Sequence, residues 1–110
     1  MKINETIQQI TLENLKPTES VIGAEVKIAE IKSVIEKYGW FDEAAIAVRD
    51  KTDGTIYLLD GHHRLAAARE LGLKEIPVVI VEFSELANFY LYYNSMEDVR
   101  RAADDVKSLR

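Results

Sequence analysis

Residues 55–69 read TIYLLDGHHRLAAAR, and this stretch sets the organisation of the chain. It begins as an apolar strand, turns at Asp60-Gly61 and continues as an alanine-rich helix over 62–71. The turn carries one carboxylate, two imidazoles and one guanidinium, between Asp60 and Arg64. The first turn of a helix presents free N–H groups and the positive end of the helix dipole. The stretch therefore predicts an anion site, where Gly61 admits a ligand close to the backbone and phosphate is the natural guest.

The rest of the chain predicts a small α+β domain. Alternating or continuous apolar runs predict strands at 7–12, 44–49, 55–59 and 76–82. Asp53-Gly54 predicts a hairpin turn between the second and third of these strands. Apolar residues at helical spacing predict helices at 24–38, 62–71 and 97–109, and the ambiguous segment 84–93 is interpreted as a helix with Ser84 as its N-cap.

The helix predicted at 24–38 is expected to cover a sheet with an apolar stripe that ends at Tyr38. Gly39 is well placed to terminate it. Before the helix, Pro17 is expected to interrupt regular structure, and Thr18 or Ser20 is expected to act as a cap for the next element.

Composition narrows the function classes. The 110 residues form one domain, of which 47% are apolar and 30% charged. The formal charge of −5 disfavours an extended nucleic-acid footprint. The chain has no cysteine, which excludes disulfides and thiolate chemistry. It has no apolar run of membrane-spanning length and no signal peptide at MKINETIQQI, so we expect no membrane association and a cytoplasmic location.

The motif order also has a family resemblance. A strand, D-G-H-H-R, a helix, Leu71-Gly72 and a strand beginning Ile76-Pro77-Val78 together resemble the ParB/sulfiredoxin fold. ParB partition proteins carry G-E-R-R at the turn and sulfiredoxins carry G-C-H-R, whereas the D-G-H-H-R form is most similar to free serine kinases, which phosphorylate L-serine. The resemblance covers residues 7–82 of the single domain 1–110 and implies a small mixed sheet with helices packed on it. Residues 84–110 would add a C-terminal helical tail.

The resemblance implies roles for two carboxylates. The matching aspartate of the kinases serves catalysis beside the nucleotide phosphates, which makes Asp60 a candidate catalytic residue and Mg²⁺ ligand. Its alternative role is an N-cap of the following helix. Glu19, in L-K-P-T-E, matches a catalytic glutamate and would take the proton of the acceptor hydroxyl. Its alternative is an exposed glutamate in the first turn of a helix.

The chemistry of the turn itself makes Gly61, His62, His63 and Arg64 candidates for phosphate binding. Adjacent helical residues point about 100° apart, so both imidazoles cannot face one ligand, and one of them can be structural. Arg64 suits a bidentate phosphate contact, and its alternative is a salt bridge to Glu70 or Asp60.

Three functions are consistent with these residues. The first is a nucleotide-binding phosphotransferase or nucleotide hydrolase that uses ATP or ADP with Mg²⁺, with L-serine as a candidate acceptor. The second is a non-enzymatic ParB-like module that senses a nucleotide such as CTP, or assists DNA partition or transcription regulation. The third is a scaffold whose C-terminal helices form a homodimer.

Overall fold

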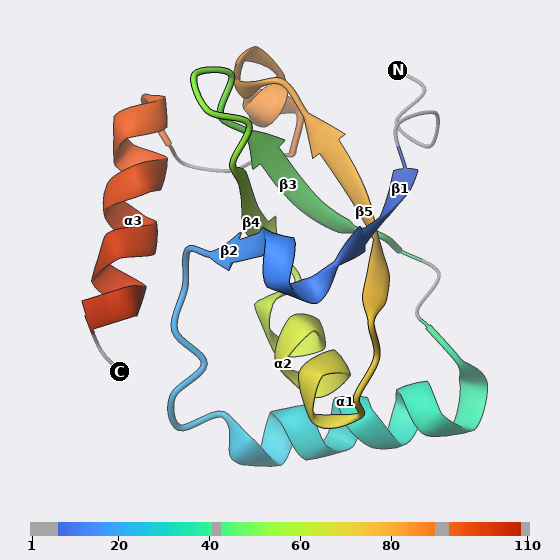
Figure 1. The fold of residues 1–110 in the computed structure, drawn as a ribbon. Helices are drawn as coiled ribbons and strands as arrows, with labels where there is room; N and C mark the ends of the chain where they lie inside the picture. The colour runs from blue at the N-terminus through green and yellow to red at the C-terminus, as the bar shows by residue number, and fades with distance from the viewer. Residues whose placement is uncertain (1–6, 41–42, 90–92, 109–110) are drawn as a thin grey trace.

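The computed structural model describes residues 7–40, 43–89 and 93–108, and within them the chain forms one five-stranded mixed sheet (Figure 1). In spatial order the strands are β1 (Ile7–Thr11), β5 (Glu75–Val81), β3 (Ala45–Arg49), β4 (Ile56–Asp60) and β2 (Leu15–Pro17). Antiparallel pairs are β1–β5 and β3–β4, while β3–β5 and β2–β4 are parallel. The expected mixed sheet and its hairpin are therefore confirmed.

Two helices are stacked on one face of the sheet. Helix α2 (His62–Glu70) lies between the sheet and α1 (Glu25–Tyr38). Leu65 and Ala68 of α2 pack against sheet residues, and Ala67 packs against Ile28 and Ile35 of α1. Alanines on both sides of α2 allow this close approach, so the helix after the D-G-H-H-R turn is held on two sides.

The opposite face of the sheet is covered by the C-terminal part of the chain. The 3₁₀ helix η3 (Phe83–Phe89) contributes Leu86, and α3 (Met96–Ser108) contributes the fully buried Val99. In Figure 1, α3 stands beside the sheet next to β2 and β4. The apolar stripe of α3 is thus used against its own sheet.

Strand prediction was accurate except at β2. The four predicted strands were found with ends within one residue, but the short edge strand Leu15–Pro17 was missed because Pro17 was expected to interrupt regular structure. Pro17 instead ends β2, which pairs only with β4. An edge strand tolerates proline because one row of its N–H groups has no ladder partner.

The capping predictions for α1 were wrong. The helix begins at Glu25, and its N-cap is Ala24 rather than Thr18 or Ser20. Gly39 does terminate the helix, with a φ of 83°. Tyr38 was placed on the buried stripe but is 73% exposed, since the contacts with α2 are made further back along α1.

The segment predicted as a helix at 84–93 is a 3₁₀ helix over Phe83–Phe89. The N–H of Glu85 donates to the carbonyl of Glu82 over 2.9 Å, the spacing of a 3₁₀ turn, and Ser84 lies inside the helix rather than capping it. Residues 90–92 and Leu109 lie outside the described residues, whereas α3 begins one residue before its prediction. No described helix is long and apolar enough to span a membrane.

Candidate functional site

The turn between β4 and α2 depends on Gly61. Its φ of 104° is left-handed, and an added Cβ would lie 3.0 Å from the Cβ of Ala45. Both the backbone and the space therefore require glycine here. Gly61 is the N-cap of α2, and no side chain caps the helix. The alternative role of Asp60 as an N-cap is wrong: Asp60 is the last residue of β4.

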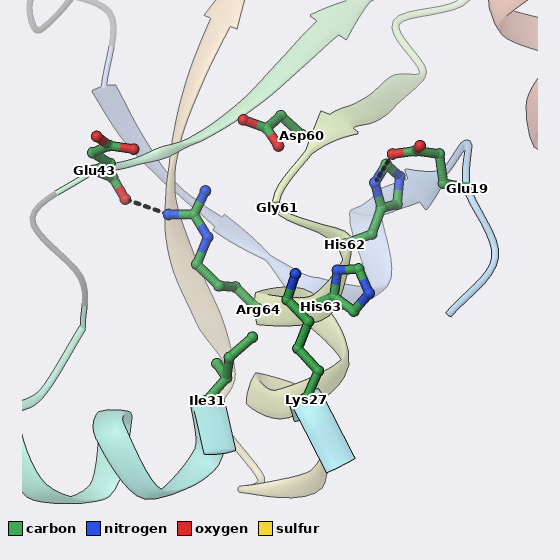
Figure 2. A pocket seen from close by; sticks show the side chains of 9 residues that line it. All are labelled: Glu19, Lys27, Ile31, Glu43, Asp60, Gly61, His62, His63 and Arg64. Carbon is green, nitrogen blue, oxygen red and sulfur yellow. Dashed lines mark hydrogen bonds and ion pairs between the residues drawn. The ribbon is translucent and has the colours of Figure 1, made fainter. Parts of the chain in front are cut away.

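An open pocket of about 600 Å³ surrounds this turn (Figure 2). Four parts of the chain line it: the segment after β2, helix α1, the segment before β3 and the turn itself. The lining residues are Glu19, Lys27, Ile31, Glu43, Asp60, Gly61, His62, His63 and Arg64. The structure thus brings together all six site residues that the sequence suggested, including Glu19, which lies 41 positions before Asp60.

The two predicted carboxylates enter the pocket from different parts of the chain. Asp60 is exposed at the end of β4, where the β3–β4 register shifts between Ile46 and Ala47. Glu19 comes after β2 and lies beside His62, with its side chain 65% exposed (Figure 2). Because α1 begins only at Glu25, Glu19 is not a first-turn glutamate of that helix. Two acidic groups therefore face a pocket from separate elements, as acid–base or metal-assisted chemistry requires.

Basic side chains share the same pocket. Arg64 donates from Nη1 to the carbonyl of Glu43 over 2.7 Å, which fixes part of its guanidinium at the rim. His63 is half-buried and lines the pocket. Lys27 reaches in from α1 toward the turn (Figure 2). Together with the uncapped N-terminus of α2, these groups make the pocket suited to an anion.

Lys27 lines the pocket but was not among the site residues suggested by the sequence. It precedes the buried Ile28 and lies four residues before Ile31, which also lines the pocket. A lysine at the edge of an apolar stripe, four residues from a stripe residue, was the available signal. The packing of α1 along α2 could not be predicted from the sequence.

The two adjacent histidines have different environments. His62 is 5% exposed, and its Nε2 accepts a hydrogen bond from the N–H of Thr18 over 3.0 Å. Its Nδ1 lies 3.0 Å from Oε2 of Glu19. Burial lowers the pKa of His62, and the nearby carboxylate of Glu19 opposes this only in part. His62 is thus the more structural of the pair, and His63 is the more open to a ligand.

A protein-only metal centre is not present in the described part of the chain, where no three histidine or acidic side chains gather around one point. A divalent cation at this pocket would need oxygen ligands from a bound phosphate in addition to any from Asp60.

Fold and pocket together define a small mixed-sheet domain with an open pocket, suited to an anion, at the N-terminus of its central helix. The chain belongs to the ParB N-terminal domain family, which it matches over residues 2–95.

Among characterised relatives, the chain is 30% identical over 100 residues to the ADP-dependent L-serine kinase SerK of Thermococcus kodakarensis. That match covers 89% of this chain and 40% of the kinase. The chain is also 30% identical over 74 residues to the ATP-dependent L-serine kinase of Staphylothermus marinus, covering 67% of this chain and 29% of that kinase. It therefore spans less than half the length of either relative.

Solved structures agree on the fold. A free serine kinase in complex with AMP superimposes with a TM-score of 0.57 and 32% identity, over 69% of this chain and 31% of that one. ParB from Caulobacter crescentus complexed with CTP-gamma-S gives 0.60 and 21% identity, over 74% and 47%. Sulfiredoxin from Arabidopsis thaliana gives 0.58 and 23% identity, over 78% and 98%. The ParB/sulfiredoxin-like fold expected from the motif order is thus confirmed.

Proposed function

We propose that this domain binds an adenine nucleotide, ADP or ATP, in the pocket at the N-terminus of α2 and transfers a phosphoryl group to a small hydroxyl acceptor, with L-serine as the first candidate. One observation carries the proposal: two carboxylates from separate elements and several phosphate-binding groups share one pocket. The serine kinases among the relatives support the choice of nucleotide and acceptor.

Phosphate would be held by the first turn of α2. Gly61 lets the phosphate oxygens approach the uncapped N–H groups, which the helix dipole makes favourable partners for an anion. Arg64, His63 and Lys27 add charged or polar donors around the same space. This arrangement replaces a glycine-rich phosphate loop of the Walker type, which the sequence lacks.

The carboxylates would carry the transfer itself. Glu19 would accept the proton of the acceptor hydroxyl while that oxygen forms its bond to phosphorus and the bond to the leaving nucleotide oxygen breaks. The carboxylate of Asp60 accepts no hydrogen bond from the described residues, and it would hold Mg²⁺ beside the phosphates. When bound, Mg²⁺ supplies charge neutralisation for the transferred group.

The proposed partners are small molecules of the cytoplasm. The net charge of −5 gives no general attraction for nucleic acid, so DNA binding by this domain alone is not part of the proposal. If water replaced the acceptor, the same pocket would act as a nucleotide hydrolase.

Calorimetric titration tests the binding step. ADP, ATP and CTP would each be titrated, with Mg²⁺, into the wild type and into Arg64→Ala, Lys27→Ala and the control Lys32→Ala. Lys32 lies on the same helix as Lys27 but pairs with Glu70 outside the pocket. We expect an adenine nucleotide to bind, and Arg64→Ala to weaken it by about 10-fold or more because a charge-assisted contact is lost. Lys32→Ala should bind as the wild type does.

Other outcomes would redirect the proposal. Clear preference for CTP would indicate a ParB-like nucleotide switch without phosphotransfer. No binding of any nucleotide would leave D-G-H-H-R as a signature of the fold alone. Adenine nucleotide binding with release of inorganic phosphate, and no phosphoserine, would indicate a hydrolase.

A further inference from the structure

Thr18 and His62 form a buried polar contact beneath Glu19. Thr18 is 5% exposed, and its hydroxyl donates to the carbonyl of Leu58 over 2.7 Å. Its main-chain N–H donates to Nε2 of His62 over 3.0 Å. The contact joins residues 44 positions apart in the sequence, so it fixes the segment after β2 against the start of α2. Both polar groups of Thr18 are therefore committed to the protein interior.

This contact dictates where the proton of His62 lies. A neutral imidazole has one donor nitrogen and one acceptor nitrogen. Nε2 receives the N–H of Thr18, so it is the acceptor, and the proton lies on Nδ1. The opposite tautomer would set two N–H groups against each other and turn the lone pair of Nδ1 toward a carboxylate.

The protonated nitrogen points at one acceptor. Nδ1 of His62 is buried and, within the described residues, has no hydrogen bond of regular geometry. Oε2 of Glu19 lies 3.0 Å away, at ion-pair distance but off the direction of a well-aligned bond. A buried donor left unsatisfied is costly, whereas the exposed side chain of Glu19 can rotate to accept it.

We propose that His62 is a positioning residue: its Nδ1–H holds the carboxylate of Glu19 at the rim of the pocket, and the main-chain N–H of Thr18 fixes the tautomer that makes this possible. The positioning role rests on the proposed function of Glu19, but the contact and the tautomer do not. Glu19 is thereby fixed at one oxygen, and its other oxygen remains available to a ligand in the pocket.

Tyr93 extends the arrangement toward the C-terminal helix. Its hydroxyl donates to Oγ1 of Thr18 over 3.3 Å from the segment that precedes α3. The charged and titratable groups that face His62 are Glu19 after β2, Asp60 at the end of β4 and His63 on α2. Burial has the largest effect and disfavours the protonated imidazole, as does His63, whereas the two carboxylates and a hydrogen bond to the backbone of Leu58 favour it.

Nitrogen-15 NMR of the imidazole rings tests the contact without any activity. The chain has two histidines, so the variant His63→Gln leaves His62 as the only imidazole signal. We expect the Nδ1–H tautomer at neutral pH, and we expect Glu19→Gln to shift the Nδ1 resonance because the acceptor of its proton changes from a carboxylate to an amide. Glu43→Gln, at another carboxylate of the pocket, is the matched control. An Nε2–H tautomer, or an Nδ1 resonance that Glu19→Gln leaves unchanged, would overturn the proposal.

Two amide variants test the positioning role in catalysis. His62→Asn places an amide donor near the position of Nδ1, whereas His62→Gln places its amide near Nε2 and leaves Glu19 without a donor. We expect His62→Gln to lower kcat by about 10²-fold with unchanged nucleotide affinity, since misplacing a catalytic group has effects of that size. His62→Asn should recover part of the loss.

Equal losses in both variants would mean that His62 is only structural. If the wild type shows no transfer to L-serine, the proposed function fails while the NMR result still decides the contact.

Discussion

Two aspartates sit at opposite ends of the β3–β4 pair and have opposite surroundings. Asp50, just after β3, is 1% exposed and accepts hydrogen bonds from the N–H and hydroxyl of Thr52 over 3.0 and 2.6 Å. Its other oxygen accepts a hydrogen bond from Nε of Arg100, a residue of α3, over 2.7 Å. Asp60, at the end of β4, is exposed, and its side chain forms no hydrogen bond or ion pair with the described residues.

The difference separates a structural carboxylate from one that is open to a ligand. Hydrogen bonds from Arg100 and Thr52 hold the pKa of Asp50 far below its usual range, so it stays ionised and tied to α3. Asp60 faces an open pocket that it shares with cationic side chains. This open position is what the proposed role of Asp60 requires, whereas the partners of Asp50 are all within the protein.

Substitution at the two aspartates should give the largest contrast. We expect Asp60→Asn to lower phosphoserine formation by at least about 10²-fold with an unchanged melting temperature, because the role proposed for this exposed group is in phosphoryl transfer and not in folding. Asp50→Asn should do the reverse, with a lower melting temperature and near-normal kcat well below it. Thermal unfolding by circular dichroism and a coupled assay measure the two effects. Normal turnover in Asp60→Asn would remove Asp60 from the catalytic residues.

Substitution of Arg100, the partner of Asp50 in its ion pair, should give the next largest effect. Arg100→Met leaves the buried carboxylate of Asp50 without its charged partner, which we expect to lower the melting temperature by roughly 4–8 °C. Arg101→Met is the matched control. Arg101 is the exposed neighbour of Arg100 on α3, and within the described residues it pairs only with Glu97 and Asp98.

The double variant sharpens this test. Asp50→Asn with Arg100→Met should be less destabilised than the sum of the single variants, since neither partner is then left buried and charged. Simple additivity would indicate that Asp50 and Arg100 stabilise the protein separately.

The sequence could predict what depends on local pattern. Apolar alternation and the Asp53-Gly54 turn defined the β3–β4 hairpin, and the glycine-led turn defined the start of α2. A three-residue edge strand such as β2 has too little pattern to detect, particularly when it ends in Pro17. The capping error at α1 has a related cause, because Thr18 was already committed to a partner far along the chain.

Site chemistry was predictable by residue type but not by environment. Asp50 and Asp60 each lie at the end of a predicted strand, and His62 and His63 are neighbours, so the sequence does not show which member of each pair is buried. Burial was decided by contacts between distant segments: α3 with the hairpin at Asp50, and the segment after β2 with His62. Such contacts become visible only when the fold is known.

The smallest of the expected effects is on the pH dependence of stability, which should differ between the His62 and Asp50 ends of the β3–β4 pair. The pKa of His62 in the folded state lies below its ordinary value of 6.5, so the folded state binds fewer protons there than the unfolded chain. The contribution of neutral His62 to the stability of the folded state is complete above about pH 6.5, and it is lost as the pH falls toward the pKa of His62 in the folded state. Asp50 also has a lowered pKa, but its contribution begins to fall only as the pH drops below its ordinary value of 3.8.

Between pH 6.5 and pH 3.8, the contribution of His62 to the stability of the fold should therefore decrease, while the contribution of Asp50 stays unchanged. We expect the melting temperature to fall by a few degrees from pH 7 to pH 5 in the wild type, and by less in His62→Gln, which has no imidazole to protonate at this position. Asp50→Asn should retain the wild-type slope in this range, because Asp50 is ionised throughout it. A slope that persists in His62→Gln would place the titrating group elsewhere, and the two ends of the β3–β4 pair would then not differ in their response to acid.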